Sequence, residues 1–466
     1  MRPFHGSRVS TVAWDLPIHC DVGVPSYRGA FGEHQAARLL WRAGFGPRPG
    51  QAAGLAKLGL HGAVQSLTRP KSKALVGPNP TDGEGGTLAP KDAWGHDHLW
   101  WLDKMVRSEA PLMERMTLVW HDWFATSKSG VPQRLMIDQN QLLRRHALGN
   151  FEELVLDITR DPAMLLWLNG TSNNRWDVNE NYARELHELF CLGAGRGYSE
   201  RDVRQLARAL TGFRNDWADR GPTHFRYDKK FHDGRAKKIY GKRGKFGWQE
   251  GVRLVTRHRR HPEFMVAKLW DYFIPTKPSP STVKALSRLY VAKDREVRPL
   301  LEAILTHPDL YDAGRRMVKP PVVQAAGMLR AVGRGIDTTA WAWLCDGAGQ
   351  YLFLPPNVSG WDDTRWLDTA TFRARWQMAQ YICEPARLDP EKDAPDVPNA
   401  PAELVSAAVA FWGSPAISST VRAGLEKYAA DTLASATEKW EKTVTPVLAL
   451  NALRMLVATS PDYLTS

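Results

Sequence analysis

Apolar residues recur along this chain mostly at the spacing of an α-helix. Over residues 32–67 they follow an i, i+3, i+4, i+7 pattern, which a cluster of Gly and Pro at residues 44–49 interrupts. Similar amphipathic stretches continue over residues 93–211 and resume at residues 261–333. No stretch of useful length alternates apolar and polar residues with the period of two that a half-buried strand requires. The pattern therefore predicts an all-α protein, a multi-helix, bundle-like domain with long irregular loops and a small helical C-terminal tail.

Breaks in the periodicity predict how the chain is divided. Residues 1–30 have no periodicity and are expected to form an N-terminal arm. The main helical domain is expected over residues 31–383, followed by a linker at residues 384–402, where Pro and Asp accumulate. Residues 403–466 are helical in pattern and are expected to form a tail that packs on the main domain.

Residues 177–193 carry the signals of both ends of a helix. Asp177 is a candidate N-cap with Glu180 three residues later, and Gly193 suits the C-terminal end. At 100° per residue this helix has one apolar face. The polar residues on the opposite face are Asn181, Arg184, Glu185 and Glu188. Because the two glutamates are neighbours on that face, their charges need compensation, and the face is either a functional site or the solvated side of a surface helix.

Imidazole and carboxylate groups from several helices form a candidate metal site. The residues predicted to hold a divalent metal are His121, His146, Glu185 and Glu188. The residues predicted to be catalytic are Glu185, Glu188, His121, Asn181 and Arg184. We expect the two glutamates to face inward, with His121 nearest to them and His232 or His146 next. Without a metal, burial of the carboxylate pair could provide an acid and a base.

A loop at residues 345–376 interrupts the helical pattern, because Pro355, Pro356 and Gly360 are incompatible with a helix there. The loop gathers aromatic and polar groups of the kind that line ligand sites. The residues predicted to bind substrate are Asn357, Trp361, Asp362 and Trp366 from this loop, together with His232 and Asp233. We expect residues 357–366 to line the same cavity as residues 181–188. The alternative is a structural loop closed by its own Trp side chains.

The excess of basic residues behind the net charge of +12 is spread along the chain, with one dense region. Residues 225–260 mix Lys and Arg with aromatic residues, as a binding site for an anionic polymer would, although a solvated basic loop has the same composition. A short hairpin is expected within residues 225–255. The four Cys residues are widely spaced and do not predict a disulfide framework. No transmembrane segment and no signal peptide is recognised, so the default expectation is a cytoplasmic protein.

Several ordered phrases of the chain resemble a known bacterial family, domain of unknown function 1800. They include NENYARELHELFCLG, SERDVRQLARALTGF, HPEFMVAKLWDYF, LPPNVSGWDD and the C-terminal SPDYL, and the resemblance extends from about residue 31 to the end. It implies a mainly helical fold without a settled activity, members that are often exported, and a sulfatase-like partner protein. The WHNHF phrase of the family is WHDWF in this chain, at residues 120–124, so a metal site that needs both His residues would be incomplete.

Two classes of function remain open from the sequence. The first is a metal- or carboxylate-dependent, hydrolase-like enzyme that acts on a polymeric or glycan-like substrate. The alternative is a non-catalytic binding or scaffold protein for an anionic or carbohydrate polymer, or for the sulfatase-like partner. Neither a nucleophile signature nor a P-loop or dinucleotide-binding fingerprint is present.

Overall fold

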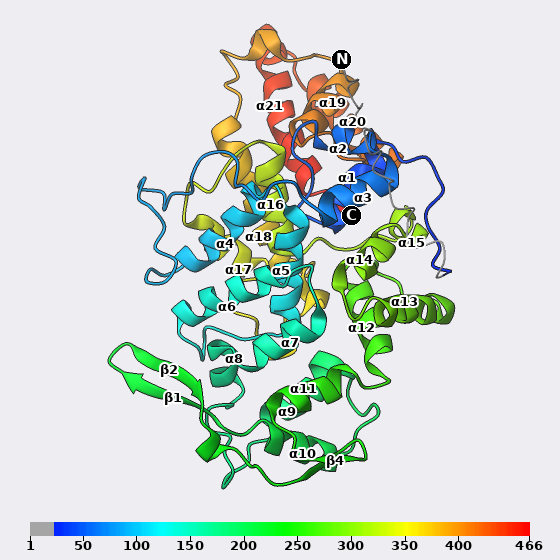
Figure 1. Ribbon diagram of the computed structural model, residues 1–466. Helices are drawn as coiled ribbons and strands as arrows, with labels where there is room; N and C mark the ends of the chain where they lie inside the picture. The colour runs from blue at the N-terminus through cyan, green and yellow to red at the C-terminus, as the bar shows by residue number, and fades with distance from the viewer. Residues whose placement is uncertain (1–22) are drawn as a thin grey trace, which may run out of the picture.

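Helices make up most of the computed structural model, which describes residues 23–466 (Figure 1). The all-α class predicted from the periodicity is therefore confirmed. Residues 1–22, which hold Cys20 and most of the predicted N-terminal arm, lie outside the described residues. None of the helices within residues 23–466 combines the length and apolar character that a membrane span requires.

The helices fall into three groups along the chain. The first group is α1 (Glu33–Arg42), α2 (Gln51–Ala56), α3 (Gly59–Thr68), α4 (His96–Arg107), α5 (Pro111–Trp123), α6 (Gln133–Arg145), α7 (Phe151–Thr159) and α8 (Pro162–Trp167). The second is α9 (Asn181–Glu185), the π-helix Leu186–Cys191, α10 (Glu200–Ala209), α11 (Trp248–Thr256), α12 (His261–Asp271), α13 (Pro280–Ala292), α14 (Val297–Leu305) and α15 (Pro308–Tyr311). The third is α16 (Pro321–Ala331), α17 (Ala340–Gly347), α18 (Thr369–Cys383), α19 (Pro401–Phe411), α20 (Ser419–Ala434), α21 (Lys439–Ala458) and α22 (Pro461–Leu464).

Two hydrophobic cores meet at α5, and this helix contributes to both. Trp120 and Trp123 belong to the core that includes α7, α12 and α14, and both side chains are fully buried. Leu118 belongs to the other core, with α4, α16, α18 and α21. Large aromatic side chains bury the most apolar surface, so they fix the C-terminal end of α5 firmly between the two cores. That end carries the WHDWF phrase.

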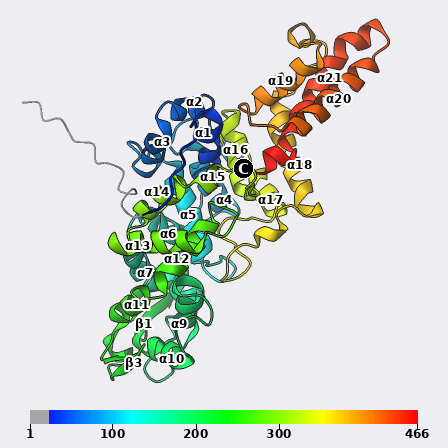
Figure 2. The same ribbon diagram turned by 90° about the vertical axis from the view of Figure 1, so that its right-hand side faces the viewer.

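The C-terminal helices α19, α20 and α21 form a group that extends away from the rest of the chain beyond α18 (Figure 2). Helix α21 packs against α18, and α22 then brings the chain end back to the centre. There, the backbone N–H of Met317 donates to the carbonyl oxygen of Ser466 over 3.0 Å, and the N–H of Ser466 donates back over 2.9 Å.

Two antiparallel hairpins interrupt the helices. Strands β3 (Lys237–Ile239) and β4 (Lys242–Gly244) form the hairpin expected within residues 225–255. Strands β1 (Phe213–Ala218) and β2 (Gly221–Tyr227) form a second hairpin that the sequence did not predict. The second half of β1 is exposed, so neither of its faces needs the alternating apolar pattern that identifies a half-buried strand.

The helix predicted from residues 177–193 is shorter and less regular than expected. It begins at Asn181 with Glu180 as a cap residue that makes no side-chain capping bond, whereas Asp177 lies in the preceding loop. From Leu186 the chain forms a π-helix, in which the N–H of Leu192 donates to the carbonyl oxygen of His187 over 2.9 Å. The two predicted faces are nevertheless kept through the wider π turn, because Leu186 and Phe190 are fully buried whereas Glu188 is partly exposed.

Candidate functional site

A cavity of about 580 Å³ lies where four segments of the chain meet. Its walls are α5, the end of α12 with the residues that follow it, residues 316–320, and the loop that contains Trp361 and Trp366. Loops held by rigid helices are common ligand sites, and this volume lies within the usual range for them.

Asp122, on the last turn of α5, joins three of these walls. Its Oδ2 accepts a hydrogen bond from the hydroxyl of Tyr272 over 2.6 Å, and its Oδ1 accepts one from the backbone N–H of Trp361 over 2.8 Å. A Cβ atom on Gly360 would lie only 2.2 Å from Oδ1, so the loop approaches Asp122 this closely because residue 360 is glycine. Burial raises the pKa of Asp122, and the bonds from Tyr272 and Trp361 oppose that rise.

Arg115 lies seven residues before Asp122, two helical turns away on the same face of α5. The side chain lines the cavity although the residue is only 4% exposed. Its Nε and Nη1 atoms find no hydrogen-bond acceptor among residues 23–466. Burial lowers its pKa to about 10, while the nearby Tyr272 and Asp122 favour the charged form. A guanidinium in such a position requires an acceptor from solvent or from a ligand.

The indole N–H groups of Trp361 and Trp366 add two further donors to the cavity walls. Neither finds an acceptor within the described chain. At the rim, Asp271 and Asp363 are exposed carboxylates, opposed by Lys277 and Arg316. The cavity therefore combines unpartnered donors and exposed acceptors without a strong excess of either charge.

The other residues predicted from the same loop have local roles. The side-chain oxygen of Asn357 accepts from the N–H of Ser359 over 2.8 Å, and that of Asp362 accepts from the N–H of Thr364 over 3.1 Å. Both bonds shape turns within the loop. Of the four predicted loop residues, Trp361 and Trp366 line the cavity, whereas Asn357 and Asp362 do not.

His121 is fully buried next to this cavity without lining it. Its ring lies 5.3, 5.7 and 5.5 Å from those of Trp101, Phe353 and Trp361, measured between centroids. Neither ring nitrogen finds a hydrogen-bond partner in the described residues, and burial lowers the pKa of His121 to about 3. The histidine is therefore neutral and is part of an aromatic cluster.

The carboxylates of the helix that begins at Asn181 face an ion-pair network. Arg184 contacts Glu188 over 3.3 Å, Glu180 over 3.4 Å and Glu200 over 2.7 Å, all between side-chain nitrogen and oxygen atoms. The side chains of Arg184 and Glu188 are 35% and 28% exposed. Burial raises the pKa of Glu185, with a smaller contribution from Glu188. Asn181 is exposed, and its backbone N–H donates to the side chain of Asn179 over 2.9 Å.

The predicted metal group is not formed. His146 pairs with Asp157 over 2.7 Å, His232 bonds to the carbonyl oxygen of Thr211 over 2.9 Å, and His187, the histidine within the π-helix, bonds to Tyr240 over 2.6 Å. Within residues 23–466, no three His, Cys, Asp or Glu side chains are placed to hold a metal. The expectation that His121 and His146 meet Glu185 and Glu188 must therefore be corrected.

The expectation of one cavity for residues 181–188 and 357–366 is also corrected. The cavity that Trp361 and Trp366 line includes none of residues 181–188. Its walls come instead from α5 and α12, whose polar residues lie within largely apolar helical stretches. The sequence therefore did not predict Arg115 or Tyr272 as site residues. The spacing of seven residues does place Arg115 and Asp122 on the same face of α5.

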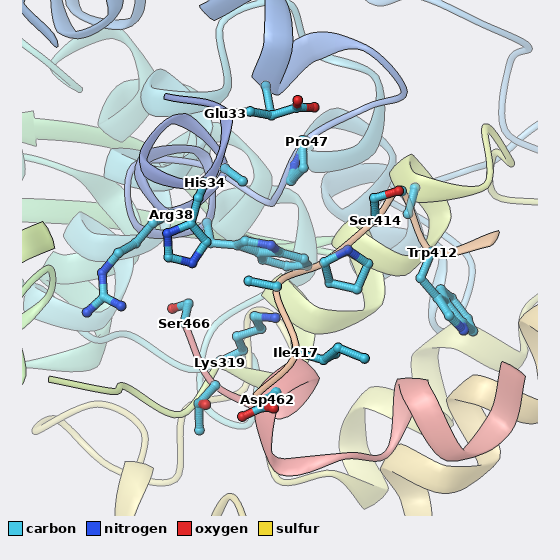
Figure 3. A pocket seen from close by; sticks show the side chains of 18 of the residues that line it. Glu33, His34, Arg38, Pro47, Lys319, Trp412, Ser414, Ile417, Asp462 and Ser466 are labelled. Carbon is cyan, nitrogen blue, oxygen red and sulfur yellow. The ribbon is translucent and has the colours of Figure 1, made fainter. Parts of the chain in front are cut away.

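A second cavity, of about 460 Å³, lies between α1, residues 413–418 and the chain end (Figure 3). Its cations are already bound to the chain. Arg38 donates to the carbonyl oxygen of Leu310, Arg316 pairs with Asp462, and Lys319 donates to the carbonyl oxygen of Tyr463. The basic side chains of this cavity are therefore less available to a ligand than Arg115 is.

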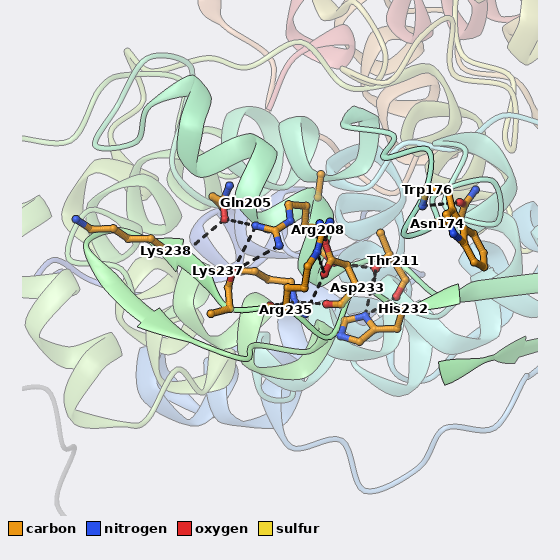
Figure 4. A network of polar contacts seen from close by, with 12 residues as sticks. Asn174, Trp176, Gln205, Arg208, Thr211, His232, Asp233, Arg235, Lys237 and Lys238 are labelled. Carbon is orange, nitrogen blue, oxygen red and sulfur yellow. Dashed lines mark hydrogen bonds and ion pairs between the residues drawn. The ribbon is translucent and has the colours of Figure 1, made fainter. Parts of the chain in front are cut away.

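The remaining predicted residues, His232 and Asp233, lie in a polar network beside α10 (Figure 4). The carboxylate of Asp233 accepts from Nε of Arg208 over 2.8 Å and from Nη2 of Arg235 over 2.9 Å. These guanidinium groups hold the pKa of Asp233 far below its ordinary value. Asp233 thus fixes the loop, and His232 lines a shallow pocket above it.

Comparison with curated proteins and with solved structures finds no match to this chain. A family model does match, and it covers residues 38–465. This range includes every residue that lines either cavity except Glu33, His34, Ala37 and Ser466. The family is described as a protein of unknown function, DUF1800. Since the match extends over nearly the whole sequence, the chain belongs to the DUF1800 family.

Proposed function

We propose that this protein binds a saccharide in the cavity beside Asp122. The observation that carries the proposal is the set of donors on its walls. Arg115, Trp361 and Trp366 each line the cavity and each has an N–H group without an acceptor in residues 23–466. An unsatisfied buried donor costs about 1–3 kcal/mol, so a ligand that supplies acceptors gains that free energy on binding.

The composition of the cavity favours sugar hydroxyls over other ligands. A hydroxyl both donates and accepts hydrogen bonds, and so it can meet Arg115 on one side and Asp363 or Asp271 on the other. Trp361, Trp366 and Tyr272 supply aromatic surface for the apolar faces of a sugar ring. The balance of acidic and basic side chains favours a ligand without a large net charge.

Isothermal titration calorimetry with a panel of neutral oligosaccharides tests the proposal. Cello-, malto- and chito-oligosaccharides are suitable probes, because they differ in linkage and substituents. We expect one of them to bind the wild type, and we expect Arg115→Met and Trp366→Phe to weaken that binding. Trp343→Phe is the matched control, since Trp343 is 43% exposed on α17 and does not line the cavity. Absence of binding across the panel, or an equal loss in the control, contradicts the proposal.

A second candidate function, hydrolysis of the bound saccharide, is favoured by one observation. Asp122 is a carboxyl with a raised pKa on the cavity wall, and Asp363 is close enough to raise that pKa further. Two carboxyl groups in different environments can act as acid and base in glycoside hydrolysis. Release of a chromogenic aglycone by the wild type but not by Asp122→Asn supports this function, and equal rates in both proteins exclude it.

A further inference from the structure

The shallow pocket above Asp233, of about 550 Å³, has a different character from the saccharide cavity. Its walls include Arg175, Trp176, Arg235 and Lys245, and it shares no residue with the cavity at Asp122. A conclusion about this pocket is therefore independent of the proposed function.

Positive charge dominates the pocket because its only carboxylate is already neutralised. Asp233 is the one acidic residue among the described residues that line it, and it is bound by Arg208 and Arg235. Arg175 and Lys245 are exposed and have no acidic partner within residues 23–466. Two unpaired cations on one pocket favour an anionic ligand.

Trp176 provides an aromatic surface in the same pocket as these cations. It is 67% exposed, although exposed tryptophans are uncommon. Its ring meets that of Phe231 edge-on, with centroids 5.5 Å apart, and the guanidinium of Arg175 lies 4.8 Å from the ring centroid. These contacts hold the indole in place and leave most of it exposed to a ligand.

The pocket is held rigid by bonds beneath it. The N–H of Asp233 donates to the hydroxyl of Thr211 over 2.8 Å, and the buried Lys237 donates to the carbonyl oxygens of Asp233 and Arg235. The N–H of Arg175 donates to the carbonyl oxygen of Phe231 over 2.9 Å and ties the two sides together. A preformed pocket loses little conformational entropy when a ligand binds.

We propose that this pocket binds one acidic sugar residue of a polysaccharide. The sugar ring lies on Trp176, and its carboxylate or sulfate group lies between Arg175 and Lys245. A nucleic acid is the less suitable polyanion, because proteins that bind single strands stack successive bases on several aromatic side chains. Trp176 is the only tryptophan, and there is no Phe or Tyr, among the described residues that line this pocket.

Biolayer interferometry with immobilised polygalacturonate, heparin, dextran and single-stranded DNA tests this assignment. We compare the wild type with Trp176→Ala and with the double variant Arg175→Gln, Lys245→Gln. The matched controls are Trp440→Ala and the double variant Lys439→Gln, Lys442→Gln, which change an exposed tryptophan and two exposed lysines on α21. All of these side chains are exposed, so the variants are expected to fold.

The wild type is expected to bind polygalacturonate or heparin but not dextran through this pocket, with an affinity that falls as salt is raised from about 50 to about 200 mM. Trp176→Ala is expected to weaken binding at least about fivefold, as removal of a stacking platform does. The affinity of the Arg175, Lys245 double variant for the acidic glycan should also depend less on the salt concentration. Equal losses in the controls, no binding to either acidic glycan, or tighter Trp176-dependent binding to DNA would overturn the assignment. If Arg115→Met loses binding of a neutral oligosaccharide, that result tests the cavity beside Asp122 and does not bear on the pocket above Asp233.

Discussion

The hydroxyl of Tyr272 donates a hydrogen bond to Oδ2 of Asp122 over 2.6 Å, between residues that are 150 positions apart in sequence. Tyr272 follows the end of α12, and Asp122 lies on the last turn of α5. Since Trp361 binds the other oxygen of the same carboxylate, this one side chain sets the relative positions of two helices and the loop around the cavity.

Replacing Tyr272 by Phe is expected to weaken this connection. The carboxylate loses one of its two donors, so the free energy of unfolding should fall by about 1–3 kcal/mol. The pKa of Asp122 should also rise further, because the bond from Tyr272 is one of the influences that lower it. Urea unfolding measured at several pH values checks both effects, and an unchanged free energy at every pH would show that the bond contributes nothing.

Replacing Gly360 by Ala is expected to separate the loop from α5. The added Cβ would lie 2.2 Å from Oδ1 of Asp122, and the φ angle of Gly360 is +95°, which alanine rarely adopts. A loss of at least about 2 kcal/mol in the free energy of unfolding is expected. Gly54→Ala is the control, because its Cβ has no close neighbour and it lies within α2, where alanine is favoured by about 0.5–1 kcal/mol. Similar stabilities of the two variants would contradict the close contact.

Buried histidines are expected to make the protein sensitive to acid. Burial lowers the pKa from 6.5 to about 3 for His98 and His121, and to about 4 for His187 and His261. The unfolded chain therefore binds protons below pH 6.5 that the folded chain does not, and stability should fall as the pH drops from 6.5 towards 4, by up to about 1.4 kcal/mol per pH unit for each histidine.

His121→Phe isolates one of these contributions. Phenylalanine fits the aromatic cluster and does not titrate, so the variant should unfold less readily than the wild type at pH 5, with a smaller difference at pH 7.5. Asp161 has the opposite effect, because burial raises its pKa to about 7. Its contribution to the free energy of unfolding therefore falls as the pH rises from about 4 to 7. As the pH falls, the loss of stability caused by the four buried histidines should exceed the gain from Asp161. A variant with the same acid sensitivity as the wild type would show that His121 is not buried and neutral.

Glu188→Gln is expected to have little effect on folding. The carboxylate is partly exposed and pairs with an arginine that has two other acidic partners, and such surface pairs contribute about 0–1 kcal/mol. Chemical unfolding checks the stability. Elemental analysis of purified wild type and variant checks the metal hypothesis: a stoichiometric metal that disappears with the substitution would restore Glu188 as a ligand.

Periodicity predicted the helical class because packing of amphipathic helices depends on local spacing. Capping signals were less reliable, since Asp177, the candidate N-cap, does not cap the helix at Asn181. The π-helix could not be predicted, since it depends on tertiary contacts such as the bond from Nε1 of Trp123 to the carbonyl oxygen of Phe190. The exposed β1–β2 hairpin was missed for lack of an alternating pattern.

The candidate site was predicted only in part. Polar residues in an irregular loop pointed to Trp361 and Trp366, which do line the cavity. Glu185 and Glu188 indicated a site because their charges are adjacent, but Glu188 pairs locally with Arg184, which also contacts Glu180 and Glu200. Arg115 and Tyr272 carry no such signal, because their role depends on contacts between helices distant in sequence. A donor without an acceptor is a property of the folded chain, so no sequence pattern predicts it.

Arg115→Met is the variant that best separates binding from stability. Replacing an unpaired buried charge by an apolar side chain of similar length is expected to leave the free energy of unfolding unchanged or to raise it. The same change should weaken saccharide binding by about tenfold to a hundredfold, because it removes charged hydrogen bonds. A protein that is strongly destabilised by this substitution would indicate that Arg115 has a structural partner instead.

The most direct measurement is the NMR spectrum of protein labelled with ¹⁵N-tryptophan during titration with the oligosaccharide that calorimetry identifies. Trp366→Phe assigns one indole signal, and Trp361→Phe assigns the other. If the saccharide binds in this cavity, the indole N–H signals of Trp361 and Trp366 shift in the wild type at the lowest saturating concentration, and both shifts are markedly smaller in Arg115→Met at the same concentration. Shifts confined to other tryptophans, or unchanged shifts of both signals in Arg115→Met, would contradict a saccharide site in this cavity.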